Sequence, residues 1–290
     1  FGMLGRIKHL KEEYKNIKDI TVALCGCMAQ EEVVVSEIKN KYKYVDFVFG
    51  THNLHDLPKL ILESEKSKKT NIEVYSIEGN VIENLPVKRD YKHKAYVNII
   101  YGCDKFCTYC IVPYTRGSQR SREMEDIIKE VEDLVKKGYQ EVTLLGQNVN
   151  AYGKDLNKGY DLADLLIKVS ETKIPRIRFV TSHPWDFTDR MIEVIESYPN
   201  IMPYVHLPLQ SGSDRILKLM GRRYTSDDYK KLYDKLRKIP NISLTTDIIV
   251  GFPGETEEDF LETINMVNYC KYDGAFTFAF SARENTPAAL

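Results

Sequence analysis

The chain has 290 residues, which is room for about two domains of ordinary size. With 43% hydrophobic residues it contains no stretch approaching about 18 consecutive apolar residues, and no charged-then-apolar leader opens it. A membrane protein and an exported protein are therefore not expected. Lysines and arginines number 41 against 42 acidic residues, so the net charge of −1 gives no support for a nucleic-acid partner.

The first part of the chain alternates helical and strand-like segments. Leu4, Ile7 and Leu10 recur at helical spacing, and the apolar run at 20–24 reads as a buried strand. We expect further helices over 30–40 and 54–66 and further strands over 45–49 and 72–77. This alternation predicts a small parallel α/β domain over 1–80, followed by a polar linker over 81–93.

A regular cadence of strand and helix begins at Lys94 and continues to the end of the sequence. Between the strands lie amphipathic helices such as 121–137, one face of which carries Met124, Ile127, Ile128, Val131, Leu134 and Val135. The pattern predicts a partial (βα)6 barrel over 94–290, whose reactive loops follow the carboxyl ends of the strands. The predicted strands are 95–101, 141–145, 176–181, 203–208, 243–250 and 274–281.

Three of the six cysteines, Cys103, Cys107 and Cys110, lie in one loop directly after the first barrel strand. Three thiolates on one loop can hold three irons of a 4Fe–4S cube and leave the fourth iron open for a small molecule. Structural metal sites normally fill every position, so we interpret the loop as a catalytic cluster site. The alternatives are a zinc site completed by Cys270 or a histidine, and a redox pair of Cys107 with Cys110. Cysteines that bind an iron–sulfur cluster or zinc fit a reducing compartment better than a disulfide framework does. We therefore expect a cytoplasmic location.

Basic residues gather locally in spite of the balanced total charge. One group precedes the cysteine loop, a second follows it, and the third is Lys218, Arg222 and Arg223. Each group is either a solvated face or a contact for phosphate. The first two groups are Lys88, Arg89, Lys92 and Lys94, and Arg116, Arg120 and Arg122.

The cysteine loop resembles the signature of the radical S-adenosylmethionine (SAM) enzymes, with an aromatic residue just before the third cysteine. The longer segment Tyr101-Gly-Cys-Asp-Lys-Phe-Cys-Thr-Tyr-Cys-Ile-Val-Pro-Tyr114 is similar to the methylthiotransferases of that superfamily. Leu207-Pro-Leu-Gln-Ser-Gly-Ser213 and Gly251-Phe-Pro-Gly-Glu-Thr256 share this similarity. Leu85-Pro-Val-Lys-Arg89 and Thr181-Ser-His-Pro184 look most like the tRNA branch, and the resemblance spans essentially the whole chain.

The resemblance implies a definite chemistry. A reduced 4Fe–4S cluster passes one electron to SAM, and the 5′-deoxyadenosyl radical that results abstracts hydrogen from C2 of isopentenyl-adenosine beside the anticodon. Sulfur takes the place of that hydrogen, and a second SAM methylates it. The implied partners are tRNA and an electron donor such as flavodoxin or ferredoxin, and we expect a monomer.

Polar residues at the ends of the predicted barrel strands are our candidates for binding SAM. Gln147 and Asn148 close the second strand, Ser182 and His183 the third, and Gln210 the fourth. Asp247 lies on the fifth strand, and the loop after it contains Gly251 and Glu255. Two structural alternatives remain open: Thr256 to Asp259 also has the pattern of an ordinary helix start, and the alternative role of His183 before Pro184 is to fix a turn.

A second cluster is implied by Cys27, which stands before Met-Ala-Gln as one of three ligands to an auxiliary 4Fe–4S cluster does in the family. Its two partners should lie earlier than this sequence begins, and the family's C-terminal RNA-binding module is also expected to be missing. Cys25 departs from the family pattern and is expected to be a small buried residue, and Cys270 to have no role. We therefore expect a fragment that binds tRNA weakly and does not complete sulfur insertion.

Two rival functions remain. The sibling enzymes that methylthiolate an aspartate of a ribosomal protein share the cluster loops, but Thr181-Ser-His-Pro184 and the basic stretch from Lys88 to Lys94 favour RNA. A zinc-stabilised nucleic-acid-binding module without catalysis leaves the polar loops at the strand ends without purpose.

Overall fold

The structure is a computed structural model that describes residues 2–14, 20–66, 71–74, 81–83 and 87–290. The chain divides into two compact units, the first comprising residues 1–85 with 114–117 and the second residues 86–113 with 118–290. The expected strand over 72–77 and the expected linker over 81–93 both run partly outside the described residues, as does the start of the segment 85–89.

The first unit is built on a small parallel sheet with the strand order β1-β2-β3. Leu24 of β1 lies opposite Val48 of β2, which in turn lies opposite Ile72 of β3. The parallel α/β character expected from the sequence is thus present. Its elements are α1 (Gly2–Glu13), β1 (Ala23–Cys25), η1 (Cys27–Gln30), α2 (Glu32–Lys41), β2 (Phe47–Phe49), η2 (Leu54–Asp56), α3 (Leu57–Lys66) and β3 (Asn71–Glu73).

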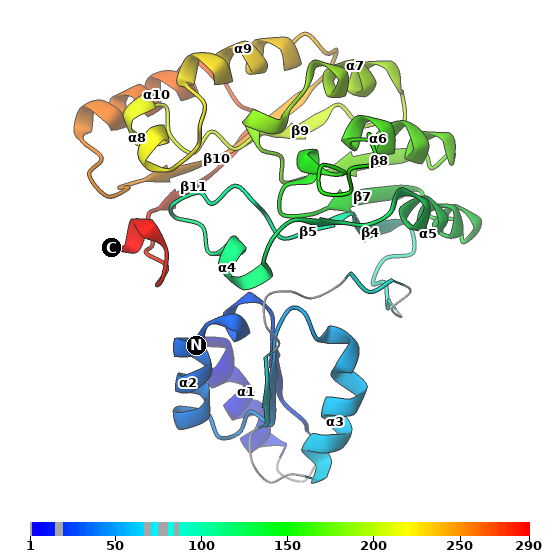
Figure 1. The fold of residues 1–290 in the computed structure, drawn as a ribbon, viewed down its shortest axis with the longest axis vertical. Coiled ribbons are helices and arrows are strands. Elements are labelled where there is room, and N and C mark those ends of the chain that lie inside the picture. The colour runs from blue at the N-terminus through cyan, green and yellow to red at the C-terminus, as the bar shows by residue number, and fades with distance from the viewer. Residues whose placement is uncertain (1, 15–19, 67–70, 75–80, 84–86) are drawn as a thin grey trace. The chain divides into compact units, whose positions relative to one another are not determined.

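The central strand β2 shows why this sheet is covered on both faces. Successive side chains of a strand point to opposite faces. Val48 accordingly packs in one apolar cluster with Leu4 of α1 and Ile38 of α2. Phe47 and Phe49 pack in another with Leu60 of α3. Figure 1 shows α1 and α2 on one side of the sheet and α3 on the other.

The second unit alternates strands and helices, as the sequence predicts. Its elements, with α4 reaching into residues counted with the first unit, are β4 (Lys94–Asn98), β5 (Ile100–Tyr101), α4 (Val112–Arg116), β6 (Arg120–Ser121), α5 (Met124–Lys136), β7 (Glu141–Leu145), η3 (Val149–Ala151), α6 (Leu162–Glu171), β8 (Arg176–Phe179), η4 (Pro184–Asp186), α7 (Asp189–Ser197), β9 (Tyr204–His206), α8 (Asp214–Leu219), α9 (Ser226–Leu236), β10 (Ser243–Val250), α10 (Glu257–Cys270), β11 (Gly274–Ala279) and η5 (Pro287–Ala289).

Two parallel three-stranded sheets, β4-β7-β8 and β9-β10-β11, form the barrel wall. A parallel bridge between Ile177 of β8 and Ile201, just before β9, joins one sheet to the other. Figure 1 shows α5, α6, α7, α9 and α10 curving around the outside of these strands. This is the partial (βα)6 barrel predicted from the sequence.

Helix α5 illustrates how the barrel core forms. Ile127, Val131 and Leu134 lie on one face of α5 and are buried, together with Val142 and Leu144 of β7. Full burial of each such side chain stabilises the fold by about 1.5–3 kcal/mol. None of the helices in the described ranges is long and apolar enough to cross a membrane.

The first predicted barrel strand, 95–101, is in fact two strands. β4 ends at Asn98, and β5 turns away to pair antiparallel with β6, placing Tyr101 opposite Arg120. The carboxylate of Asp155 holds β6 in place, accepting hydrogen bonds from the backbone N–H (2.7 Å) and the hydroxyl (2.6 Å) of Ser121. A local pattern of apolar residues does not reveal such a distant anchor.

Three other barrel strands end earlier than expected, at Phe179, His206 and Ala279. After β8 the chain reaches Thr181, whose φ of +71° lies in the left-handed region. This region is a genuine outlier for a β-branched residue. The extended backbone therefore stops where the polar loops begin.

Candidate functional site

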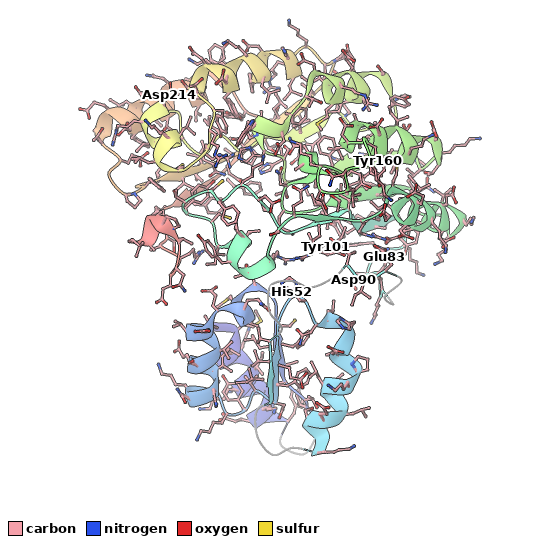
Figure 2. The ribbon with its side chains drawn as sticks, viewed as in Figure 1. His52, Glu83, Asp90, Tyr101, Tyr160 and Asp214 are labelled. Atoms are coloured by element: carbon pink, nitrogen blue, oxygen red, sulfur yellow. The ribbon has the colours of Figure 1, made fainter. Side chains whose placement is uncertain are left out.

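The cysteine loop begins directly after β5. Figure 2 labels Tyr101 at the end of β5, and Gly102 follows with a φ of +73°. The backbone N–H of Gly102 donates to Oε1 of Gln147, 2.8 Å away, which ties the loop to the end of β7. Cys107 is buried, and Cys103 and Cys110 are half-buried.

The same loop is fastened to the end of helix α8. The backbone N–H of Thr108 donates to the carbonyl of Met220 (3.0 Å), and its hydroxyl donates to the carbonyl of Leu219 (2.8 Å). Within the loop, the N–H of Cys110 donates to the carbonyl of Cys107 (2.9 Å). These bonds give the three cysteines fixed backbone positions.

Two of the three thiols, Cys103 and Cys110, ionise less readily than a free cysteine. Burial raises the pKa of Cys103 to about 11 and raises the pKa of Cys110 as well. Metal binding deprotonates a thiol, since the thiolate is the ligand. In the described part of the chain no group of three His, Cys, Asp or Glu side chains gathers around a single ion. A 4Fe–4S cube does not need such a group, because each thiolate binds a different iron.

Tyr109, the aromatic residue before the third cysteine, joins the loop to the next part of the site. Its ring packs against an apolar cluster of Ile216, Met220 and Phe252. Phe252 belongs to the loop after β10. The cysteine loop, the end of α8 and the loop after β10 therefore share one small core.

Four buried polar atoms near the strand ends have no hydrogen-bond partner among the described residues. They are Oδ1 of Asn148, Nε2 of His183, Oε1 of Gln210 and Oε1 of Glu255. Each belongs to a residue predicted to bind a cofactor, after β7, β8, β9 and β10 respectively. An unsatisfied buried group costs about 1–3 kcal/mol. The four atoms thus fit a polar ligand held at the carboxyl ends of the strands.

Hydrogen bonds fix what two of these atoms offer. The Nδ2 amide of Asn148 donates to Asp186 (2.7 Å), so its Oδ1 is left as an acceptor. Nδ1 of His183 accepts from the backbone N–H of Trp185 (3.3 Å), so Nε2 carries the proton and is left as a donor. Burial, assisted by Arg222, Lys105 and Lys154, lowers the pKa of His183 to about 2, and the ring is neutral at ordinary pH.

Gln210 and Gly251 both take left-handed backbone conformations beside the site. Gln210 has a φ of +70°, and this strain at a non-glycine residue costs about 1–3 kcal/mol. Gly251 also has a φ of +70°, with open space where a Cβ would stand. Oε2 of Glu255 closes the turn by accepting from the N–H groups of Gly251 and Phe252, which leaves Oε1 free. Thr256 caps α10, as the alternative interpretation of this segment predicts.

The remaining predicted residues already have partners within the protein. Ser182 donates its hydroxyl proton to the carbonyl of His206, and Gln147 accepts from Gly102. Oδ2 of Asp247 lies 3.3 Å from Nε2 of His206, and its neighbour Thr245 lies 3.0 Å from Nδ1 of the same ring. Contact of Ser182, Gln147 or Asp247 with a cofactor stays a prediction.

Asp186 is a central residue that the sequence analysis missed. Its buried carboxylate accepts hydrogen bonds from Lys105 of the cysteine loop (2.8 Å), Lys154 (2.6 Å) and Asn148 (2.7 Å). Burial opposes its charge, but these three donors outweigh burial and lower its pKa. Its place three residues after His183, in the same segment, was the available signal.

The basic groups are not simply solvated faces. Arg122 is 8% exposed and pairs with Glu130 at 2.7 Å, and Arg222 is 4% exposed. For these two residues the expectation of a solvated face and the expectation of a phosphate contact are both wrong, because their guanidinium groups bind protein atoms. Arg223, next in the chain, is exposed.

Cys27 lies in the first unit, at the carboxyl end of the small sheet. Gly26, with a φ of +106°, turns the chain from β1 into η1, and Nε of Arg116 donates to Sγ of Cys27 at 3.1 Å. Cys25 is exposed, so the expectation that it is buried is wrong. Leu24 packs into the core, and Cys25 follows it on the edge strand β1, so the side chain of Cys25 points to the opposite face of the sheet.

The chain is similar in sequence to proteins of known family. A sequence model of the radical SAM superfamily matches residues 97–267. The tRNA-2-methylthio-N(6)-dimethylallyladenosine synthases of Staphylococcus epidermidis and Staphylococcus aureus are 56% and 55% identical to the chain, over 100% of its length. The chain spans 56% of the length of these relatives.

A solved structure shares the fold. The radical S-adenosylmethionine methyltransferase TsrM from Kitasatospora setae, with cobalamin and a [4Fe-4S] cluster bound, superposes with a TM-score of 0.58 at 18% identity. The match covers 74% of this chain and 43% of that one.

Proposed function

The chain belongs to the radical SAM superfamily, and from that premise we propose that it is the catalytic part of a tRNA methylthiotransferase. Its cofactors are the superfamily's, a 4Fe–4S cluster and SAM. When bound, they supply a 5′-deoxyadenosyl radical that can take hydrogen from a carbon unreactive toward acids and bases. The identity of 56% along the whole chain supports the methylthiotransferase assignment over other branches.

The protein's own part in this reaction is to bind, orient and exclude water. Cys103, Cys107 and Cys110 would each hold one iron and leave the fourth open. Asn148, Gln210 and Glu255 offer acceptors for the amino groups and hydroxyls of SAM, and His183 offers a donor.

The observation that carries the proposal is the set of four unpaired buried atoms at the ends of four successive strands, beside the cysteine loop. Fixed polar groups of this kind act without reorganising during the reaction.

For the substrate we propose C2 of isopentenyl-adenosine beside the anticodon, where sulfur would replace hydrogen and be methylated from a second SAM. Cys27 would contribute to an auxiliary 4Fe–4S cluster. The remaining elements of the proposal are an electron donor such as flavodoxin or ferredoxin, a cytoplasmic location and a monomeric protein. The printed names of the relatives support the tRNA substrate. Neither the ribosomal-protein alternative nor the zinc module is favoured.

The cofactor half of the proposal is tested by anaerobic iron and sulfide analysis. We expect about four irons per chain at the open site, and their loss when Cys103, Cys107 and Cys110 are all replaced by alanine. The chain should also form 5′-deoxyadenosine from SAM in the presence of dithionite, and the triple variant should not. Stoichiometric zinc without a brown chromophore would contradict the assignment.

The substrate half is tested in a protein that has the full length of the curated relatives, of which this chain spans 56%. We would replace the matching region of the Staphylococcus epidermidis relative with this chain and express the chimera in cells that lack their own enzyme. Mass spectrometry of tRNA nucleosides should then show the 2-methylthio product, and a chimera with Cys107→Ala should not. A chimera that cleaves SAM but leaves tRNA unmodified would refute the proposed tRNA substrate. If the same chimera methylthiolates an aspartate of a ribosomal protein, that aspartate is the substrate.

A further inference from the structure

Arg222 is a buried cation with no carboxylate partner among the described residues. Its Nε donates to the hydroxyl of Tyr224 (3.0 Å) and its Nη2 to the carbonyl of Pro208 (3.0 Å). Its Nη1 lies 3.5 Å from the hydroxyl of Tyr109 and 3.6 Å from Sγ of Cys107. Since an isolated buried charge is costly unless it is paired, this arrangement calls for an anion beside the guanidinium.

Of the groups that contact the guanidinium, Cys107 is the one suited to become that anion. The hydroxyls of Tyr109 and Tyr224 are neutral at ordinary pH, because a tyrosine ionises only at about pH 10. The carbonyl of Pro208 carries no charge. The thiol of Cys107 becomes a thiolate when it binds iron, and it is only 7% exposed. The positive charge and the expected negative charge thus meet where water is largely excluded.

The contact is held by the backbone on both sides. Arg222 follows α8, and its N–H donates to the carbonyl of Leu217 (2.9 Å) after Gly221 has turned the chain with a φ of +71°. The same end of α8 receives the hydrogen bonds of Thr108, the neighbour of Cys107. Arg222 and Cys107 therefore lie on two segments that are directly bonded to each other.

We propose that Arg222 is the counter-cation of the cluster, donating an N–H to the sulfur of Cys107 and thereby setting how readily the cluster accepts an electron. This positioning and tuning role rests on the cluster site proposed above. Reduction adds one electron, taken from the external reductant, and no bond to Arg222 forms or breaks. A fixed positive charge favours the more negative, reduced state, and hydrogen bonds to cluster sulfurs act in the same direction.

The test is an anaerobic redox titration of the reconstituted chain with dithionite, followed by the visible and electron paramagnetic resonance spectra of the cluster. Arg222→Gln removes the charge and keeps a hydrogen-bond donor. We expect it to shift the equilibrium at least tenfold toward the oxidised cluster, which is about 59 mV for one electron. Arg223→Gln, a change of the exposed neighbour, is the matched control and should shift it less than threefold.

Iron content and circular dichroism establish that each variant is folded and loaded. If the loaded Arg222→Gln cluster shifts its reduction equilibrium by less than tenfold from the wild type, the proposal is overturned and Arg222 is left as a structural link to Pro208. If Arg222→Gln does not hold the cluster, Arg222→Lys decides, since it keeps the charge. We expect the lysine variant to load and to stay within tenfold, and a folded lysine variant without cluster would overturn the proposal. Wild-type chain without iron would instead refute the cluster site itself.

Discussion

Replacing Asp186 tests whether this buried carboxylate organises the site. The side chain is 2% exposed, and its partner Lys105 is 17% exposed. Breaking a buried pair by removing one partner costs about 3–5 kcal/mol, because the other charge is left uncompensated. Lys154 is 56% exposed and can turn into water, so its loss adds less than about 1 kcal/mol.

Asn148 adds to the effect, because its amide loses the acceptor that fixes its orientation. An unsatisfied buried amide costs about 1–3 kcal/mol, part of which the first figure already contains. We therefore expect Asp186→Ala to lower the free energy of unfolding by about 3–5 kcal/mol in all. Because the pKa of Asp186 is lowered, its contribution is present above the unfolded value of about 3.9 and is lost as the pH falls through the folded value. The cost should thus be constant between pH 5 and 8.

Urea unfolding measured by fluorescence is the suitable assay. Trp185 is the single tryptophan of the chain and neighbours Asp186, so it reports on the second unit. The matched control is Asp133→Ala, whose ion pair with Lys136 is 51% and 72% exposed and whose loss should cost less than about 0.5 kcal/mol. A loss below about 1 kcal/mol for Asp186→Ala would refute the reasoning from buried charge.

Three further changes probe the strand ends. The pKa of His183 is about 2 when folded against about 6.5 when unfolded, so stability should fall by about 2–3 kcal/mol between pH 7 and 4.5, and His183→Gln should remove that loss in urea titrations. Gly251→Ala should cost about 1–2 kcal/mol because of its positive φ, and Gly251→Asn clearly less; equal losses would argue against backbone strain. In Gly146→Ala the new methyl would lie 2.2 Å from Cγ2 of Ile100, and we expect a loss of stability of about 1–3 kcal/mol together with weaker iron retention. Thermal unfolding measures the loss, and an unchanged melting temperature would show that β5 moves aside without cost.

Local patterns were sufficient to predict most of the fold. The strands 141–145 and 243–250 are present as β7 and β10 with the expected ends. The helix expected over 121–137 is present as α5 (Met124–Lys136), which buries Ile127, Val131 and Leu134 of the expected apolar face, whereas Ser121 belongs to β6. These elements are predictable because their side chains repeat with the period of the structure they form. The cysteine loop was recognisable because its ligands are close together in the sequence.

The details that a local pattern missed depend on distant partners. Asp155 binds the backbone of β6, which pairs antiparallel with β5, and no residue near Tyr101 in the sequence predicts this pairing. In the sequence Arg222 has the pattern of a charged surface group, because Cys107, whose sulfur it contacts, is 115 residues away along the chain. Asp186 likewise acquires its importance from Lys105 and Lys154, which other loops supply.

The short antiparallel pair of β5 with β6 has a consequence for how the thiols capture metal. With Tyr101 opposite Arg120, both ends of the intervening segment are joined at its base. The entropy of closing that segment is thus lost when the polypeptide folds, before any iron arrives. Once one thiolate has bound, the other two meet the same iron–sulfur unit at a high effective concentration, as linked binding groups do. The pair thereby makes the three cysteines a pre-organised chelate.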